Sequence, residues 1–200
     1  PRSTLFPYTT LFRSGHFLAK LKSKGWTVQG IEPDSGARAI ATEQLGYENI
    51  VDSFDMINSK NEYDLISLWH VLEHIPDLDD YLTRIKILIK KNGRIFIAVP
   101  NHDSFDAAHY KDYWAAYDVP RHLYHFNQNS MKKLAQKFGL KIVDTIPMKL
   151  DAYYVSFLSE KYKNNGFINY FNSILTAYKS NSYAKNNGNY SSLIFVMKVK

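Results

Sequence analysis

The sequence has no cysteine among its 200 residues. Disulfide bridges and thiolate metal ligands are therefore excluded, and the composition fits a reducing cytosol. It also lacks an apolar run of about 18 residues, which a membrane-spanning helix would need. No charged, apolar and small-residue succession near the start predicts a signal peptide. We therefore expect a cytoplasmic protein, and the length suits one domain with a well-buried core.

Acidic residues are scarce towards the C-terminus. Residues 131–200 carry 11 Lys and Arg but only 3 Asp and Glu, whereas residues 15–130 carry 12 against 16. The net charge of +6 therefore combines a mildly acidic body (−4), a basic C-terminal third (+8) and two arginines among residues 1–14 (+2). Such a region permits peripheral contact with an anionic membrane surface. Its lysines are scattered among Asn, Ser and Tyr, which favours a solvated surface, and without a basic face carrying interleaved aromatics we expect no nucleic-acid partner.

Short apolar strands alternate with amphipathic helices along most of the chain. Helices are expected over residues 15–24, 35–45, 77–91 and 129–138, and strands over 26–31, 49–51, 64–69, 94–99, 140–146 and 192–199. Strands that alternate with helices of about 10 to 15 residues indicate a parallel sheet with helices on both faces. The sequence therefore predicts an α/β, doubly wound fold, mostly parallel, with the last strand antiparallel to the strand that begins at Leu140.

Four segments do not fit this alternation. Residues 101–127 form an irregular stretch rich in His, Asp and aromatic side chains, and loops of this length are usually functional. Residues 151–178 offer two amphipathic pieces that could cover a site or touch a membrane surface, and 181–189 are expected to be a polar loop. Residues 1–14 are identical to the translation of a common sequencing-library adapter. We therefore expect an artefact over 1–14 that replaces the natural N-terminus, and a domain over 15–200.

Residues typical of a cofactor site stand at the ends of the expected strands. Glu32 directly follows the second strand, where a carboxylate can accept hydrogen bonds from ribose hydroxyls. Trp69 and His70 end the fourth strand, and Gly15 opens the first helix. Ligands of open α/β sheets bind at the carboxyl ends of strands. Together these positions predict a nucleoside-cofactor crevice.

Five stretches carry a resemblance to a known family. They are Gly15-His16-Phe17-Leu18, Gly30-Ile31-Glu32-Pro33, residues 63–74 ending in Val-Leu-Glu-His, residues 93–101, and Arg121-His122-Leu123 with Phe126. Over residues 15–146 the chain resembles the ubiquinone-biosynthesis-type branch of class I S-adenosylmethionine-dependent methyltransferases. The resemblance implies a Rossmann-like sheet of order 3-2-1-4-5-7-6, with S-adenosylmethionine lying across strands one, two and four.

The resemblance also implies roles for individual residues. Gly15 would belong to the cofactor loop and Glu32 would bind the ribose. Ser53 and Phe54 would border the adenine, while Trp69 and His70 would face the methionine end and the substrate.

The first strand and its glycine loop depart from the family pattern, Asp-x-Gly-x-Gly-x-Gly. Counting back from Gly15 puts Arg13 and Leu11 at the glycine positions and Thr9 at the acid. Side chains there obstruct close approach of the backbone to a ligand, so we expect weak or absent cofactor binding by this chain. The first strand is expected to be missing or replaced, with Tyr8–Phe12 having the β propensity to take its position.

Residues 70–74 also spell His-x-x-Glu-His, the inverted zinc-peptidase pattern. That pattern needs a helix and a third ligand, whereas His70 ends a strand. We therefore expect no metal, and we expect Glu73 and His74 to fix the loop by hydrogen bonding. His70 and His122 are candidates for a general base, although each could equally be a structural histidine.

An aromatic and ionisable group lies in the irregular stretch. Trp114, Tyr117, Arg121 and His125 suit a substrate pocket. The sequence thus predicts S-adenosylmethionine-dependent methyl transfer to a small-molecule or lipid-linked acceptor, impaired in this chain. A nicotinamide-dependent oxidoreductase, which would need a Gly-x-Gly-x-x-Gly loop, and a non-catalytic Rossmann-like binding domain are the alternatives.

Overall fold

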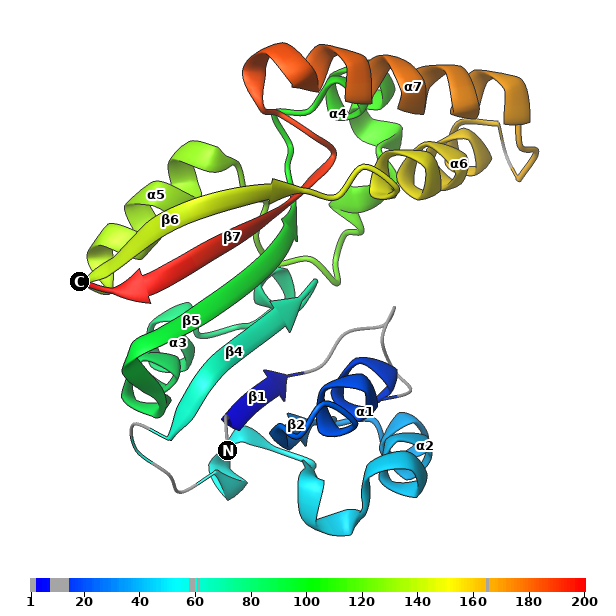
Figure 1. The fold of residues 1–200 in the computed structure, drawn as a ribbon. Coiled ribbons are helices and arrows are strands. Elements are labelled where there is room, and N and C mark those ends of the chain that lie inside the picture. Colours follow the sequence, from blue (N-terminus) through cyan, green and yellow to red (C-terminus); the bar gives the residue numbers. More distant parts are fainter. Residues whose placement is uncertain (1–2, 8–14, 58–59, 61, 165) are drawn as a thin grey trace.

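The computed structural model describes residues 3–7, 15–57, 60, 62–164 and 166–200. At its centre is a seven-stranded sheet of order β3-β2-β1-β4-β5-β7-β6 (Figure 1). The strands are β1 (Ser3–Pro7), β2 (Thr27–Ile31), β3 (Ile50–Val51), β4 (Tyr63–Trp69), β5 (Ile89–Pro100), β6 (Leu140–Pro147) and β7 (Ser192–Val199). Pairs are parallel except that β7 runs antiparallel to β5 and β6. The expected fold class and strand order are confirmed.

Helices cover both faces of the sheet. The α-helices of the described residues are α1 (His16–Lys22), α2 (Ser35–Leu45), α3 (Leu78–Leu88), α4 (Phe105–Tyr110), α5 (Gln128–Lys137), α6 (Asp151–Lys163) and α7 (Tyr170–Asn187). In Figure 1, α1 and α2 lie on one face, and α3 and α5 lie on the other. Each face has its own apolar cluster, a small one around Leu18, Val28 and Leu45 and a large one around Ile66, Leu82 and Met131. The layers therefore match the doubly wound prediction.

The position of the first strand is filled by Ser3–Pro7. This β1 pairs in parallel with β2, Ser3 opposite Thr27 and Pro7 opposite Ile31, and with β4 at Thr4 and Leu5. The segment expected to take this position, Tyr8–Phe12, lies outside the described residues, and so does the altered glycine loop. Backbone groups on the facing edges of β2 and β4 need partners, and a β-prone peptide supplies them.

Several element boundaries differ from the prediction. Helix α3 ends at Leu88 because Ile89, fully buried, already pairs with Tyr63 in the sheet. Gly93 therefore lies inside β5, beside a register shift, and does not stop a helix; a Cβ there would approach Ile89 to 2.7 Å. Helix α2 begins at Ser35 and is capped by the side chain of Asp34, which accepts from the Ala37 N–H.

The irregular stretch after β5 also contains helical structure. Helix α4 is followed by two short 3₁₀ turns, Lys111–Tyr113 and Ala115–Tyr117. The expected polar loop over 181–189 is wrong for most of its length, because α7 continues to Asn187 and ends at Gly188 in a left-handed conformation. Helices α6 and α7 form a hairpin beyond the carboxyl end of β5 (Figure 1). Within the part of the chain that the structure describes, no helix is both long and apolar enough to span a bilayer.

Candidate functional site

Glu32 lies directly after β2 and is buried, with a relative exposure of 5%. Its carboxylate accepts a hydrogen bond of 2.9 Å from the Asp34 N–H. Its backbone is held on both sides, since its N–H donates to the Val51 carbonyl and Arg38 donates to its carbonyl at 2.7 Å. A buried acid at the carboxyl end of a strand is costly unless its hydrogen bonds are satisfied. The local structure therefore fixes Glu32 where the sequence predicted it.

Gly15 caps α1 with φ at +70°, in the left-handed region. A Cβ at this position would also approach Leu45 to 3.0 Å and Ala41 to 3.3 Å. Glycine is therefore required both by the backbone conformation and by the close packing of α1 on α2. At the second residue of α1, the Phe17 ring meets the Trp69 ring edge to face, with centroids 6.0 Å apart. This contact connects α1 with the end of β4.

Ser53 and Phe54 lie just after β3, at the same edge of the sheet. Ser53 has an extended backbone and opens the 3₁₀ turn Phe54–Met56. The Phe54 ring packs against Tyr81 of α3 at 4.9 Å and lies under the Arg84 guanidinium at 5.8 Å. Phe54 therefore packs against α3 whether or not a ligand is bound beside it. Its expected place next to the adenine stays a prediction.

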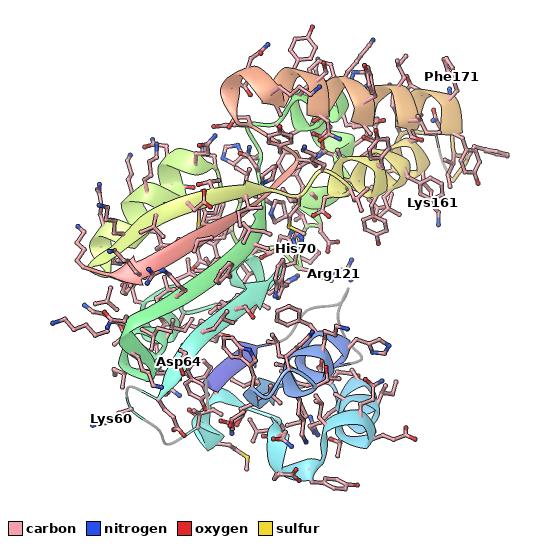
Figure 2. All side chains as sticks on the ribbon, viewed as in Figure 1. Lys60, Asp64, His70, Arg121, Lys161 and Phe171 are labelled. Carbon is pink, nitrogen blue, oxygen red and sulfur yellow. The ribbon has the colours of Figure 1, made fainter. Side chains whose placement is uncertain are left out.

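His70 directly follows β4 in a left-handed conformation, with φ at 53°. That conformation costs about 1 to 3 kcal/mol for a residue with a side chain, and the His70 N–H bond to the Ala98 carbonyl, 2.9 Å, helps to hold it. The ring lies between two carboxylates, with Nδ1 3.2 Å from Glu73 and Nε2 3.1 Å from Asp151 (His70 is labelled in Figure 2). Burial alone would lower the pKa of His70, but the bonds and charges of Asp151 and Glu73 outweigh it and raise the pKa to about 9. At neutral pH the ring is a cation.

Glu73 is fully buried in the 3₁₀ turn Leu72–His74. One carboxylate oxygen contacts His70, and the other, Oε2, has no hydrogen-bond partner among the described residues. The Glu73 carbonyl accepts from the Leu123 N–H at 2.8 Å, and His74 Nδ1 donates to the Arg121 carbonyl at 3.0 Å. Both residues therefore hold the irregular stretch at Arg121 and Leu123 against this turn through hydrogen bonds.

His122 is brought to this turn from the irregular stretch. Its Nδ1 donates to the Ala116 carbonyl at 2.8 Å, so Nε2 carries the lone pair in the neutral ring. Burial lowers the pKa of His122 from its ordinary value. Ligand-type atoms of Glu73, His74 and His122 lie within 4.8 Å of one another. Zinc accepts these ligand types; the expectation that the chain binds no metal stays a prediction.

The four residues expected to line a substrate pocket differ in burial: some are packed inside the segment and others lie on the surface. Trp114 is buried and donates its indole N–H to Asp106 at 2.8 Å, so it supports the segment from within. Tyr117 packs its ring on Trp114 and on His125, with centroids 5.0 Å away in each case. Arg121 is exposed and pairs with Asp118. None of these positions decides a role in substrate binding.

Sequence reasoning missed two acidic residues. Asp151 is the first residue of α6 and contacts His70. Asp106 is buried and accepts hydrogen bonds from Ser180 and Ser191 as well as from Trp114. A signal for Asp151 existed, since it is one of only three acids in residues 131–200. No pattern in the sequence marked Asp106, because its hydrogen-bond partners lie as far as 85 residues away.

Comparisons with known proteins agree with this geometry. A family model described as a methyltransferase domain matches residues 13–145. The ubiquinone biosynthesis O-methyltransferase of Aeromonas salmonicida is 32% identical over 77 residues, a match that covers 37% of this chain and 32% of that protein.

Solved structures share the fold. Phosphoethanolamine N-methyltransferase 2 of Haemonchus contortus, in complex with S-adenosyl-L-methionine, matches with a TM-score of 0.62 and 17% identity, over all of this chain and 49% of that one. A SAM-dependent methyltransferase of Archaeoglobus fulgidus matches with a TM-score of 0.63 and 16% identity, over 98% and 86%. The family model covers well over half of the sequence, and the chain belongs to the methyltransferase-domain family.

Proposed function

We propose that this chain derives from an S-adenosylmethionine-dependent methyltransferase and carries its cofactor-binding and acceptor-facing residues. The observation that carries the proposal is the buried Glu32 at the carboxyl end of β2, beside the neighbouring ends of β1 and β4. The chain's match spans about a third of its curated relative and about half of one structural relative, so the activity of the whole protein is part of the proposal.

The described residues fit a nucleoside cofactor. Glu32 supplies a carboxylate for the ribose hydroxyls, and Gly15 keeps a Cβ out of the turn into α1. Bound there, S-adenosylmethionine would supply a methyl group activated by a sulfonium centre. Ser53 and Phe54 would border the adenine, and Trp69 and His70 would face the methionine end.

The charges around His70 suit a cationic ligand. The His70 imidazolium lies between Glu73 and Asp151, so the trio carries one net negative charge when both acids are ionised. Burial strengthens the attraction of such a trio for a sulfonium. The role of the chain is then to position and to stabilise charge, because methyl transfer is an in-line displacement that depends mainly on alignment.

Of the two candidate bases, His122 suits a hydroxyl acceptor better. Its Nε2 bears a lone pair at neutral pH, because the pKa is lowered by burial and Nδ1 is committed to the Ala116 carbonyl. His70 is already protonated and holds two carboxylates. His122 would take a proton from the acceptor, while His70 would orient the loop.

The acceptor class in the proposal is a small molecule or a lipid-linked molecule. The relatives' printed names include a ubiquinone biosynthesis O-methyltransferase and a phosphoethanolamine N-methyltransferase, whose acceptors differ. Trp114, Tyr117, Arg121 and His125 are the proposed acceptor-side group, with Trp114 as a support. A cytoplasmic location is also part of the proposal, and the cysteine-free composition fits it.

The antiparallel β7 disfavours the oxidoreductase alternative. Dinucleotide-binding sheets have the order 3-2-1-4-5-6 with parallel strands, whereas here β7 lies antiparallel between β5 and β6. A non-catalytic binding domain shares the fold, and only binding and turnover separate it from an enzyme.

Calorimetric titration with S-adenosylmethionine tests the proposal. The unmodified chain is expected to bind weakly, because Leu11 and Arg13 stand at glycine positions of the family pattern. The variant Thr9→Asp/Leu11→Gly/Arg13→Gly restores that pattern. We expect its affinity to rise by about tenfold or more for each glycine, with NAD⁺ giving no heat.

Two results would contradict the proposal. Heat from NAD⁺ in place of S-adenosylmethionine would favour the oxidoreductase, and no heat from either ligand in a folded triple variant would favour a cofactor-free domain. Micromolar binding by the unmodified chain would instead show that the altered loop does no harm.

A further inference from the structure

Helix α7 has an inverted distribution of apolar side chains. Its buried residues are small or hydroxylated: Ser173, Thr176, Ala177, Ser180 and Ala184. Its exposed residues include large apolar ones: Tyr170, Phe171, Ile174, Leu175 and Tyr178. Helices that pack on a protein core in water normally bury their large apolar face. A helix that packs through small residues and turns large apolar ones outward has the pattern of helix pairs that contact lipid.

Several exposed aromatic residues lie at the free end of the α6–α7 hairpin, whereas Ile174, Leu175 and Tyr178 lie further along α7. We call Lys161, Tyr162, Lys163, Phe167, Tyr170 and Phe171 the tip patch. Phe167 and Phe171 are 82% and 78% exposed. Figure 2 shows Lys161 and Phe171 at this end of the hairpin, away from the sheet. The Phe157 ring of α6 packs against the Tyr170 ring at an angle, with centroids 5.4 Å apart, so the aromatic surface continues from one helix to the other.

The charge of the hairpin surface is of one sign. Residues 149–187 contain five lysines and two acids. Both acids turn inward: Asp151 binds His70, and Glu160 is 1% exposed and accepts from Asn164 and Asn172. The lysines of α6 and α7 remain on the surface, at 161, 163, 179 and 185. An aromatic tip that carries Lys161 and Lys163, on a hairpin whose two acids turn inward, fits an anionic surface.

We propose that the tip patch docks on an anionic lipid bilayer. Tyrosine and phenylalanine insert at the level of the headgroups, and each nearby lysine adds attraction to anionic lipid. A second copy of the chain fits less well, because pairing two tips would bring like charges together. Helix α6 connects the patch to the site, since its first residue, Asp151, contacts His70 and its last turn carries Lys161. Docking therefore holds the strand-end site within about 20 Å of the bilayer surface, one length of α6.

Co-sedimentation of the full chain with vesicles tests this proposal. We expect binding to vesicles of equal phosphatidylcholine and phosphatidylglycerol, much weaker binding to pure phosphatidylcholine, and a loss of binding in high salt. Phe167→Ser/Phe171→Ser is expected to weaken the binding by about tenfold or more. Lys161→Ser/Lys163→Ser is expected to weaken it by about fivefold for each lysine.

Matched controls lie elsewhere on the surface. Tyr47→Ser removes an aromatic side chain that is 87% exposed, and Lys132→Ser/Lys133→Ser removes two exposed lysines of α5. Both are expected to bind vesicles like the unmodified chain. Circular dichroism checks that each variant is folded, which is expected because every changed side chain is exposed.

Three results would overturn the proposal. The first is no sedimentation of the folded, unmodified chain with the mixed vesicles. The second is equal binding by the tip variants and the controls. The third is a dimer in light scattering that Phe167→Ser/Phe171→Ser dissociates, which would make a second copy the occupant of the patch.

Discussion

The Nε2 atom of His70 lies 3.1 Å from the Oδ2 atom of Asp151, although the two residues are 81 positions apart in the sequence. The other ring nitrogen lies 3.2 Å from Glu73. One imidazolium thus joins the end of β4, the turn after it and the first residue of α6. The hairpin that carries the tip patch is held to the strand-end site through this group.

The His70 bridge predicts that stability falls in mild alkali. Its two carboxylates raise the pKa of His70 from 6.5 to about 9 in the folded chain, against the effect of burial. A raised pKa means that the stabilisation is complete below pH 6.5 and is lost as the pH rises through about 9. The free energy of unfolding is expected to fall by about 3 kcal/mol over this window. Urea denaturation at successive pH values measures it; a His70→Asn variant with the same slope would contradict the assignment.

Asp151→Asn is expected to lower the pKa of His70, because it removes one of the two charges that stabilise the imidazolium. The shift can be read from the His70 ring protons by NMR titration. Asp144→Asn is the matched control: Asp144 is an exposed acid of β6 that is also in the basic C-terminal third. An unchanged His70 pKa in Asp151→Asn would mean that the 3.1 Å contact carries no charge interaction in solution.

The sequence was sufficient to predict those features that depend on residues close together in the chain. The apolar run before Trp69 predicted a buried strand, and its end predicted the place of His70. The Leu88–Ile89 boundary was misjudged because the pairing of Ile89 with Tyr63 overrides a helical pattern that continues to Lys91. Contacts between distant residues, such as His70 with Asp151, leave no local periodicity. The outward apolar face of α7 was visible as a pattern, but only the structure shows that this face is exposed.

Glu32→Gln is expected to lower S-adenosylmethionine affinity by about 10² to 10³-fold in the chain with the restored glycine loop, since bonds to a charged acceptor contribute about 1.5 to 3 kcal/mol each. The amide keeps the size of the side chain and can still accept from the Asp34 N–H. Calorimetry measures the loss. Glu43→Gln, an exposed position on α2, is the control. An affinity equal to that of the control would remove Glu32 from the cofactor site.

Asp106→Ala is expected to destabilise the chain by about 3 kcal/mol or more. The carboxylate is fully buried and accepts from Trp114, Ser180 and Ser191, at 2.8, 2.6 and 2.7 Å. Its removal leaves three buried donors unpaired, each at a cost of about 1 to 3 kcal/mol before relaxation. Urea denaturation measures the change, with the exposed Asp112→Ala as control. A loss below about 1 kcal/mol would show that water replaces the carboxylate.

Two substitutions at His122 separate proton transfer from structural support. Asn places its amide N–H near the position of Nδ1 and can preserve the 2.8 Å bond to the Ala116 carbonyl, but it removes Nε2. If His122 is the base for a hydroxyl acceptor, His122→Asn lowers kcat by about 10² or more with KM little changed. His109→Asn is the control, because His109 is an exposed histidine of α4 that lies outside the proposed acceptor-side group. The rate is measured as S-adenosylhomocysteine release with a hydroxyl acceptor that the glycine-restored chain turns over. Equal kcat in His122→Asn and His109→Asn, with a loss only in a variant such as His122→Ala that breaks the bond to Ala116, would make His122 a structural histidine.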